Sequence, residues 1–381
     1  MVPDSGPIHY AERVESRSID RLVRYARAVA SIVARRVKVR ARPIHMQIEP
    51  TSKCNLECPM CLRKEVFGAG SHMGYALFER VFQQVRPLHM TLNGQGEPLL
   101  NRDIFRMISL AESNGCRVNL TSNGNFLYRF YGDLIDSKLT LLSVSLDSVD
   151  PEAYRLVRSK DRLDQTLAGL EALQAEKKKR GVTHPVVRIS SVMMQATLDH
   201  ARAFVDKAAE LGIQSVLFQP MALFGKWDNL ALMGPYADRA KYQETLQGLD
   251  AYARSKGIDT NLDQVLADFA IVVQNYDAGV GVDHALSKGC PFPWFSLYVR
   301  ADGKVHPCCV RSYATTGFVG DLSKQDMGEI WNSDAYQDVR RVFRDGKTLP
   351  YQECVGCAPP TLPEMIGKTR YTPAFMRLVG R

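Results

Sequence analysis

The sequence predicts an α/β protein whose main domain is a partial barrel of six parallel strands. From about residue 44 to 220, runs rich in β-branched residues alternate with amphipathic helical runs. Two of the helical runs end in Gly115 and Gly212, as helices that lead back into strands often do. Right-handed crossovers between successive strands would curl such a sheet into part of a barrel.

Each strand and helix of this alternation can be located by its residues. The strands are expected in HMQIEP, LHMTLN, RVNLTSN, LTLLSVSLD, VVRISSVMM and QSVLFQP. The helices are expected in YALFERVFQQVR, RDIFRMISLAESNG, DQTLAGLEALQAEKKKRG and HARAFVDKAAELG. A parallel sheet of this kind carries its site at the carboxyl ends of the strands. Functional residues are therefore expected in the loops that follow the strands.

A second, smaller α+β domain is expected near the C-terminus. SLYVRADGKVHPCC contains two strand-like runs around an Asp-Gly turn, which predicts a β-hairpin. Further helices are expected in RAKYQETLQGLDAYARSKG, DQVLADFAIVVQNY and EIWNSDAYQDVRRVFRDG. The predicted segments are a basic helical extension at 1–43, the barrel at 44–225, a helical connector at 226–287, the small domain at 288–360 and a tail at 361–381.

Length and composition set the class of protein. With 381 residues, 45% of them apolar and 24% charged, the chain can form one large globular domain and a smaller one. The longest uncharged run near the N-terminus is too short to span a membrane, and Arg interrupts each apolar stretch that a signal peptide would need. A cytoplasmic protein is expected, in which thiols stay reduced and grouped cysteines bind metal. No nucleic-acid module is recognisable, so the basic pI does not predict DNA or RNA binding.

Positive charge is concentrated at the N-terminus. Residues 1–44 contain ten Lys or Arg against four Asp or Glu, in a chain whose net charge is +8. Apolar residues recur there at helical spacing, namely Ile19, Leu22, Val23, Ala26, Val29, Ala30 and Val33. The favoured interpretation is a helix that lays this apolar face on the barrel and exposes its basic residues to solvent. The alternative is a helix that contacts an anionic partner, substrate or membrane surface.

The nine cysteines form two groups and one single residue. Cys54, Cys58 and Cys61 lie in the loop after the first predicted strand, and no fourth Cys or His lies within reach in that loop. Three thiolates can hold a zinc ion or three of the four irons of a cubane iron–sulfur cluster. Structural zinc sites normally use four protein ligands, whereas an iron without a protein ligand is open to a small molecule. Cys116 is expected to be a packed thiol near the start of a strand.

CxxxCxxC is the spacing typical of the radical S-adenosylmethionine (radical SAM) superfamily, which the chain resembles over residues 44–220. In that family the open iron binds the amino and carboxylate groups of S-adenosylmethionine, and an electron from the 4Fe–4S cluster cleaves the sulfonium to a 5′-deoxyadenosyl radical. NGQGEPLLN resembles the Gly-Glu-Pro motif, and TSNGN resembles the ribose-contacting segment. The resemblance implies a cofactor site that includes Met60, Gly96, Glu97, Pro98, Ser122, Asn123, Ser145 and Arg158. Glu97 would satisfy the ammonium and Arg158 the carboxylate, although each of these residues could also be an ordinary turn or helix residue.

The second cysteine group lies in the predicted small domain. Four thiolates from a hairpin and a helix–loop can complete either an iron–sulfur cluster or a zinc site. GCPFPWFSLYVRADGKVHPCC, GDLSKQDMGEIWNS and CVGC resemble the twitch domain, the shortened form of the SPASM extension. That resemblance implies one auxiliary 4Fe–4S cluster bound by Cys290, Cys308, Cys354 and Cys357. Cys309 is left over, as a packed thiol, an exchangeable ligand or a hydrogen-atom donor.

The predicted reaction begins with removal of a hydrogen atom from the substrate. The domain arrangement resembles that of the aminocyclitol dehydrogenases, which implies oxidation of an alcohol to a ketone with the auxiliary cluster as electron acceptor. Redox-neutral epimerisation with Cys309 or Cys116 as hydrogen donor, peptide modification and a non-catalytic zinc protein are the alternatives. A hydroxyl-rich substrate such as a sugar or cyclitol is expected, because polar residues would face the barrel mouth: Gln47, Glu49, Asn93, Gln95, Arg188, Ser191 and Gln219. A flavodoxin or ferredoxin would supply electrons.

Overall fold

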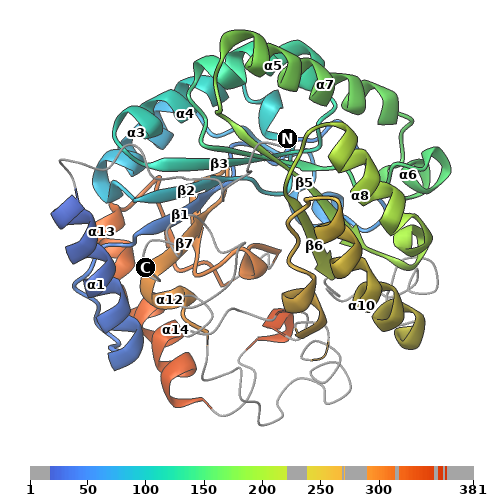
Figure 1. The fold of residues 1–381 in the computed structure, drawn as a ribbon. Coiled ribbons are helices and arrows are strands. Elements are labelled where there is room, and N and C mark those ends of the chain that lie inside the picture. Colours follow the sequence, from blue (N-terminus) through green and yellow to red (C-terminus); the bar gives the residue numbers. More distant parts are fainter. Residues whose placement is uncertain are drawn as a thin grey trace.

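The computed structural model describes residues 18–220, 238–267, 270, 290–313, 317–346, 351–354 and 357. A single nine-stranded sheet runs through it in the order β6-β5-β4-β3-β2-β1-β7-β8-β9 (Figure 1). The strands are β1 His45–Ile48, β2 His89–Leu92, β3 Arg117–Ser122, β4 Leu141–Ser145, β5 Val186–Met193, β6 Val216–Pro220, β7 Ser296–Val299, β8 Lys304–His306 and β9 Gly320–Asp321. Strands β1 to β6 are all parallel, which confirms the six predicted strands and their order.

Helices cover the outer side of the curved sheet (Figure 1). Around the barrel they are α3 Tyr75–Val85, α4 Ile104–Ser113, α5 Leu127–Asp136, α6 Pro151–Arg158, α7 Leu163–Arg180, α8 Ala201–Glu210 and α10 Arg239–Ser255. Shorter elements in the loops are α2 Arg63–Phe67, η1 Pro98–Leu100, η2 Gln195–His200, η4 Val310–Tyr313 and η5 Gln352–Cys354. The four predicted barrel helices are confirmed as α3, α4, α7 and α8. Sequence reasoning missed α5, whose apolar residues follow directly on the TSNGN turn.

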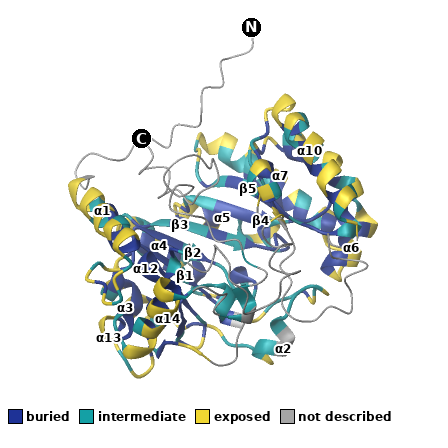
Figure 2. Ribbon diagram, turned by 90° about the horizontal axis from the view of Figure 1, so that it is seen from below, coloured by how far each residue is buried: buried dark blue, intermediate teal, exposed yellow. Residues whose placement is uncertain are grey.

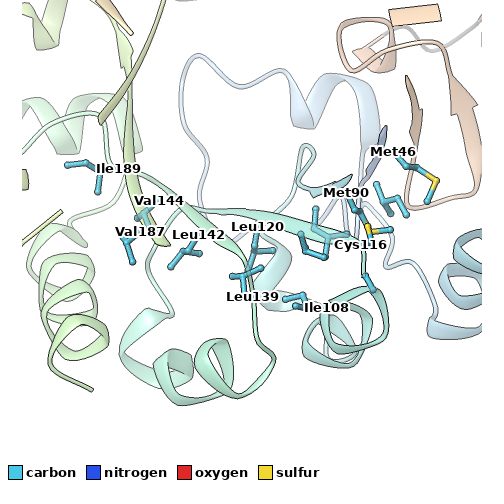
Figure 3. Close-up of a cluster of buried hydrophobic side chains, with 14 of the residues drawn as sticks. Met46, Met90, Ile108, Cys116, Leu120, Leu139, Leu142, Val144, Val187 and Ile189 are labelled. Atoms are coloured by element: carbon cyan, nitrogen blue, oxygen red, sulfur yellow. The ribbon is translucent and has the colours of Figure 1, made fainter. Parts of the chain in front are cut away.

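The barrel strands alternate between an apolar outer face and a polar inner face. Met46, Met90, Leu120, Val144 and Ile189 are buried and pack with the helices outside the sheet (Figure 3). Because side chains alternate along a strand, the neighbours of these residues point to the inside of the barrel. Parallel strands that are buried on both faces are usually apolar throughout. The polar inner face therefore indicates a lining for a ligand.

The C-terminal hairpin extends the same sheet. Strand β7 pairs in parallel with β1, and β7, β8 and β9 then pair antiparallel, which confirms the predicted β-hairpin. The remaining helices are α12 Phe292–Phe295, α13 Met327–Trp331 and α14 Asp334–Asp345. The single helix predicted at 329–346 was wrong: it is divided between α13 and α14. The division lies at Ser333, whose hydroxyl accepts a hydrogen bond from Tyr336 N and so starts a new helix.

The N-terminal helix α1, Ser18–Ala34, packs the opposite way from the prediction. Its contact face holds Tyr25, Ala28 and Ile32, all buried, whereas the apolar face that was expected to lie on the barrel is exposed (Figure 2). Ile19 is 77% exposed and Leu22 is 61% exposed. Hydrogen bonds to the body of the protein decide the orientation, and helical periodicity alone could not reveal them.

Part of the prediction falls outside the described residues. Most of the helix expected in DQVLADFAIVVQNY lies there, as do much of the connector at 226–287 and the whole tail at 361–381. The helix predicted in RAKYQETLQGLDAYARSKG is confirmed as α10. Among the described residues, no helix combines the length and apolarity that a membrane span requires.

Candidate active site

The loop after β1 carries Cys54, Cys58 and Cys61 at the carboxyl edge of the sheet. All three thiols are partly buried, and each of Cys54 and Cys58 interacts electrostatically with the other cysteines of the loop. Burial raises the pKa of Cys58 to about 11 and also raises the pKa of Cys54. Bare thiols in this setting keep their protons, so a metal that binds them must displace those protons.

Amide side chains attach this loop to the segment after β3. Asn123 donates from Nδ2 to the Asn55 side-chain oxygen at 2.8 Å, and the same nitrogen lies 3.9 Å from the Cys54 sulfur. Asn55 in turn donates to the side-chain oxygen of Asn125 at 2.9 Å. The predicted ribose-contacting residue Asn123 is therefore also a support for the cysteine loop.

The end of α6 holds the other side of the loop. Ser159 accepts a hydrogen bond from Glu57 N at 3.1 Å, and Lys160 donates to Asn55 O at 2.6 Å. The Cys58 thiol lies 3.9 Å from the carbonyl oxygen of Arg158. The segment after β3 and the end of α6 thus position one short loop.

The Gly-Glu-Pro segment after β2 packs directly on the backbone of the cysteine loop. Glu97 N donates to Lys53 O at 2.9 Å. A Cβ atom at Gly96 would lie 2.3 Å from Thr51 O and 2.4 Å from Lys53 O, so this close approach requires glycine. Pro98 begins the short helix η1. The motif therefore fixes the position of the cysteine loop through backbone contact.

The Glu97 carboxylate is fully buried and joins the segments after β2 and β3. Its Oε1 accepts from Leu99 N at 3.1 Å and from the Ser122 hydroxyl at 2.8 Å, and its Oε2 accepts from Asn123 N at 2.6 Å. Burial raises the pKa of Glu97, although these three hydrogen bonds oppose the shift. The carboxylate thus has a bracing role that the sequence did not suggest, beside its predicted role toward an ammonium group.

Arg158 forms a buried ion pair with Asp147. Its Nε lies 2.7 Å from Asp147 Oδ2, and both side chains are almost completely enclosed. Burial lowers the pKa of Arg158, but Asp147 and Cys58 more than offset this effect, so that the pKa is raised overall. Asp147 also accepts from Val192 N at 2.8 Å, which places the guanidinium against the end of β5. A carboxylate ligand at Arg158 would share the guanidinium with Asp147.

Met60 and Ser145 occupy different surroundings. Met60 packs against the small apolar cluster of Val157 and Met194, which ties the cysteine loop to α6 and to the end of β5. Ser145, at the carboxyl end of β4, is partly exposed and lies 3.4 Å from the Ser190 hydroxyl. The role of each toward a cofactor stays a prediction.

The inner face of the barrel carries polar groups that hydrogen-bond one another in separate sets. Gln47 Nε2 donates to Asn93 Oδ1 at 2.6 Å. Arg188 donates from Nη2 to the Ser143 hydroxyl at 2.7 Å, and that hydroxyl donates to Asn119 Oδ1 at 3.2 Å. Gln47, Asn93, Asn119 and Arg188 all keep part of their surface exposed. Such groups can hydrogen-bond a polar ligand in the barrel.

Two residues that were expected at the barrel mouth are closed off. Ser191 is buried and donates to Asp147 O at 2.8 Å. Glu49 is completely buried, and its two carboxylate oxygens accept from Gln95 N and Ala301 N, each at 3.3 Å. The prediction that they face a substrate was therefore wrong. Burial raises the pKa of Glu49 to about 7.

The second cysteine group is brought together from four places in the C-terminal part. Cys290 precedes α12, Cys308 follows β8, Cys354 ends η5, and Cys357 follows it. Burial raises the pKa of all four, to about 12 for Cys354, and neighbouring thiols add to the shifts of Cys290, Cys354 and Cys357. Within the described parts of the chain, no three Cys, His, Asp or Glu side chains are as close as a single metal ion needs.

Cys309 lies beside this group and Cys116 lies far from it. Burial and the neighbouring Cys308 raise the pKa of Cys309 to about 12. Cys116 is 1% exposed and packs in the outer apolar layer at the start of β3 (Figure 3), which confirms that it is a packed thiol.

Sequence families and a curated relative identify this arrangement. A radical SAM superfamily model matches residues 48–201, and an iron–sulfur cluster-binding SPASM model matches residues 290–358. The GTP 3′,8-cyclase of Staphylococcus carnosus is 30% identical over 330 residues, which cover 78% of this chain and 91% of that protein. The chain belongs to the radical SAM superfamily.

Two further proteins are similar to this radical SAM enzyme. The probable GTP 3′,8-cyclase of Methanopyrus kandleri is 30% identical over 226 residues, covering 56% of this chain and 70% of that protein. A crystal structure of Streptococcus suis SuiB bound to S-adenosylmethionine has a TM-score of 0.61 and 16% identity, covering 86% of this chain and 74% of that one. At that identity the likeness shows the fold alone. None of these three proteins is named as a sugar or cyclitol dehydrogenase.

Membership of this family identifies the cofactors. The radical SAM domain binds S-adenosylmethionine and a 4Fe–4S cluster, and the SPASM domain binds auxiliary iron–sulfur clusters. The donor sets fit these groups: three thiols gather on a loop at the carboxyl edge of the sheet, and four gather in the C-terminal part. Cysteine thiolates are the ligands that iron–sulfur clusters prefer.

Sequence reasoning missed several residues of this radical SAM site. Asn55, Asn125 and Asp147 carry the contacts between the three loops, and Gly94 leaves room for the Glu49 side chain, whose Cγ would lie 2.4 Å from an added Cβ. Asp147 lies two residues after the end of β4, at the carboxyl edge of the sheet, and this position was a signal for it. The pairing of Asn55 with Asn125 joins residues 70 positions apart, so that no local pattern could predict it.

Proposed function

We propose that this radical SAM enzyme oxidises a hydroxyl-bearing small molecule, such as a sugar or cyclitol, held against the polar inner face of the barrel. The observation that carries the proposal is the inner face itself. Gln47, Asn93, Asn119 and Arg188 line the barrel, and the cysteine loop lies at the carboxyl end of the same strands. A polar lining of this kind suits a ligand whose hydroxyl groups can replace water.

In this proposal Cys54, Cys58 and Cys61 hold the first cluster, and Cys290, Cys308, Cys354 and Cys357 hold the auxiliary cluster. When bound, the cofactors supply a 5′-deoxyadenosyl radical that removes a hydrogen atom, and an acceptor for one electron. The alcohol loses that hydrogen atom, the electron and its hydroxyl proton, and becomes a ketone. Four thiolates occupy all four irons of a cubane, which supports electron transfer over substrate binding at the auxiliary site.

In this proposal the residues of this chain bind and orient the cofactor and the substrate. The Glu97 carboxylate holds Ser122 and Asn123 in place beside the cysteine loop. The buried pair of Arg158 and Asp147 fixes a positive charge next to Cys58, where a carboxylate of the cofactor would be stabilised. Inside the barrel, Arg188 and Gln47 present N–H donors to substrate oxygens.

A nucleotide is the second candidate substrate. Two relatives, most of whose length is matched by this chain, are named as GTP 3′,8-cyclases, one of them as probable. The Arg188 guanidinium on the inner face supports an anionic group there. Because a ribose is also rich in hydroxyls, the same lining fits both candidates. The reaction would then join two parts of one molecule, without net loss of hydrogen.

The deciding experiment is a substrate screen with the protein reconstituted with iron and sulfide under anaerobic conditions. Dithionite and S-adenosylmethionine are added with sugars, cyclitols, nucleoside triphosphates or peptides, and stimulated formation of 5′-deoxyadenosine is measured. In D₂O, a sugar or cyclitol product two mass units lighter supports oxidation. A product of unchanged mass from a nucleotide supports cyclisation.

Cys309→Ala separates oxidation from epimerisation. A dehydrogenase keeps its turnover in this variant, because its substrate never takes a hydrogen atom back. An epimerase that uses Cys309 loses turnover and, in the wild type, gives a product one mass unit heavier in D₂O. That result, or stimulation by peptides alone, would contradict the proposed oxidation.

A further inference from the structure

We propose that α1 docks this protein on the surface of an anionic lipid bilayer. This inference is independent of the substrate. It rests on an exposed apolar face, on the contacts that hold this face outward, and on the charge of the residues around it. The outer face of α1 consists of Ile19, Leu22, Val23, Ala26, Ala30 and Val33.

The outer face is a continuous apolar surface on one side of the helix. The spacing of its residues, three or four positions apart, places them on the same side of an α-helix. Ile19, Leu22 and Val33 are 77%, 61% and 65% exposed, and Val23 is 39% exposed. Single exposed apolar residues are common on proteins, but an aligned set along 15 residues marks an interaction surface. Figure 2 shows the exposed side of α1 at the edge of the molecule.

Contacts on the opposite side prevent the helix from turning this face inward. Arg21 donates to Gly115 O and Arg24 donates to Arg86 O, each at 2.8 Å. Tyr25 hydrogen-bonds with the ring of His89. These partners precede or begin β2 and β3. The helix therefore lies at the amino ends of the strands, locked with its apolar residues toward solvent.

Positive charge is concentrated on α1 and in the segment that follows it. Residues 18–44 contain eight Lys or Arg and one acidic residue, Asp20, which makes a net charge of 8 − 1 = +7. The side chains of Arg27, Arg36, Lys38, Arg40 and Arg42 are exposed. An apolar face beside a run of Lys and Arg is typical of helices that lie in the interface of anionic membranes, where the apolar side chains enter the acyl boundary and the basic ones meet lipid headgroups.

Charge favours a bilayer over the other occupants of this face. A second copy of the chain would bring its own net +7 segment against this one, and like charges would oppose the contact. A nucleic acid would satisfy the basic residues but would leave the apolar side chains in water, because phosphate contacts carry most of such binding. An anionic bilayer satisfies both at once.

The position of α1 also sets the orientation of a docked molecule. The helix lies at the amino ends of β2 and β3, whereas the cysteine loop lies at the carboxyl end of β1 in the same parallel sheet. Docking through α1 turns the site away from the lipid. A water-soluble substrate and an electron donor keep their access, so vesicle binding and cofactor cleavage are separable measurements.

The test is sedimentation of the full reconstituted chain with vesicles of phosphatidylcholine, with and without phosphatidylglycerol. We expect binding only to the vesicles that contain phosphatidylglycerol, and its loss at about 0.5 M salt, where screening is strong. The double variant Leu22→Glu and Val33→Glu, at exposed positions, should weaken binding at least about tenfold. The pair Lys38→Gln and Arg40→Gln should weaken it several-fold. Leu156→Glu on α6, where Leu156 is 47% exposed, is the matched control and keeps full binding.

Three results would overturn the inference. The protein could fail to sediment with either kind of vesicle. Binding could persist in the Leu22→Glu and Val33→Glu variant, which would reveal a purely ionic contact of the kind that nucleic acid also makes. Light scattering could show a dimer that this variant converts to a monomer, so that a second copy covers the face. The 5′-deoxyadenosine yield without vesicles stays as in the wild type in all these variants, which confirms that they are folded.

Discussion

The two cysteine groups of this protein are built in different ways. Cys54, Cys58 and Cys61 lie within eight residues of one loop, and the ends of β2, β3 and α6 brace that loop from outside. Cys290, Cys308, Cys354 and Cys357 come from segments up to 67 residues apart, and only the packing of the C-terminal part brings them together. The first group is a local motif with tertiary supports, whereas the second exists only after folding.

This difference predicts different sensitivities. The position of the first cysteine group should depend on small residues that let neighbouring backbone segments approach its loop. The spacing of these cysteines is already set by the loop's own sequence. The second should depend on the integrity of the hairpin and α14, and its loss should leave the barrel intact. Glu49 connects the two regions, since it accepts hydrogen bonds from Gln95 N after β2 and from Ala301 N after β7.

Cys58→Ala should have the largest effect. The first cluster would lose one of its three proposed protein ligands, so formation of 5′-deoxyadenosine falls to background and the iron content falls from about eight to about four per chain. Iron analysis and chromatography of the reaction measure both quantities. Cys116→Ala, which removes a thiol from the apolar outer layer, is the control and keeps both near wild type. Normal cleavage in Cys58→Ala would remove the basis for placing the cofactor at this loop.

Cys357→Ala should separate the two groups. Cleavage of S-adenosylmethionine persists, because the barrel loop is untouched, while substrate oxidation stops for want of an electron acceptor. The measurement compares 5′-deoxyadenosine with oxidised product in the same reaction. Persistent oxidation would show that the C-terminal group does not accept the electron and would make it purely structural.

Gly96→Ala tests whether close backbone contact positions the barrel loop. The added Cβ would lie 2.3 Å from Thr51 O, so the loop must move. We expect a loss of about 2 kcal/mol in the free energy of unfolding, as for other overpacked sites, and a drop in cleavage of about tenfold. Gly74→Ala is the matched control, because a Cβ there meets nothing within 4 Å and its φ of −74° suits alanine. Equal behaviour of the two variants would contradict the supporting role of Gly96.

Glu49→Gln should change the pH dependence of stability. Burial raises the pKa of Glu49 to about 7, above its unfolded value of about 4.3. Between these values the folded protein holds the extra proton. The Glu49 contribution to the free energy of unfolding therefore falls as pH rises, by up to about 4 kcal/mol, and levels off above pH 7. The variant lacks this decline. Denaturant unfolding from pH 5 to 8 measures it, with the exposed Glu79→Gln as control, and an unchanged slope in Glu49→Gln would refute the shift.

Much of this architecture followed from local pattern. The six parallel strands, the C-terminal hairpin and the two cysteine groups are visible in the sequence, because strand periodicity, an Asp-Gly turn and thiol spacing are properties of neighbouring residues. The Gly-Glu-Pro and Ser-Asn-Gly segments could be placed at one edge for the same reason. In a parallel sheet all strand ends of one kind meet there.

The sequence by itself determined which residues could bind metal and cofactor, since that depends on residue type and spacing. Tertiary structure decided which polar groups are available. It buries Glu49 and Ser191 and pairs Arg158 with Asp147. It also directs the Glu97 carboxylate to accept hydrogen bonds from Ser122 and Asn123. It also decided which face of α1 meets the barrel. Helical periodicity defines two faces of a helix, but only the acceptors at Gly115 and Arg86 select the one that is buried.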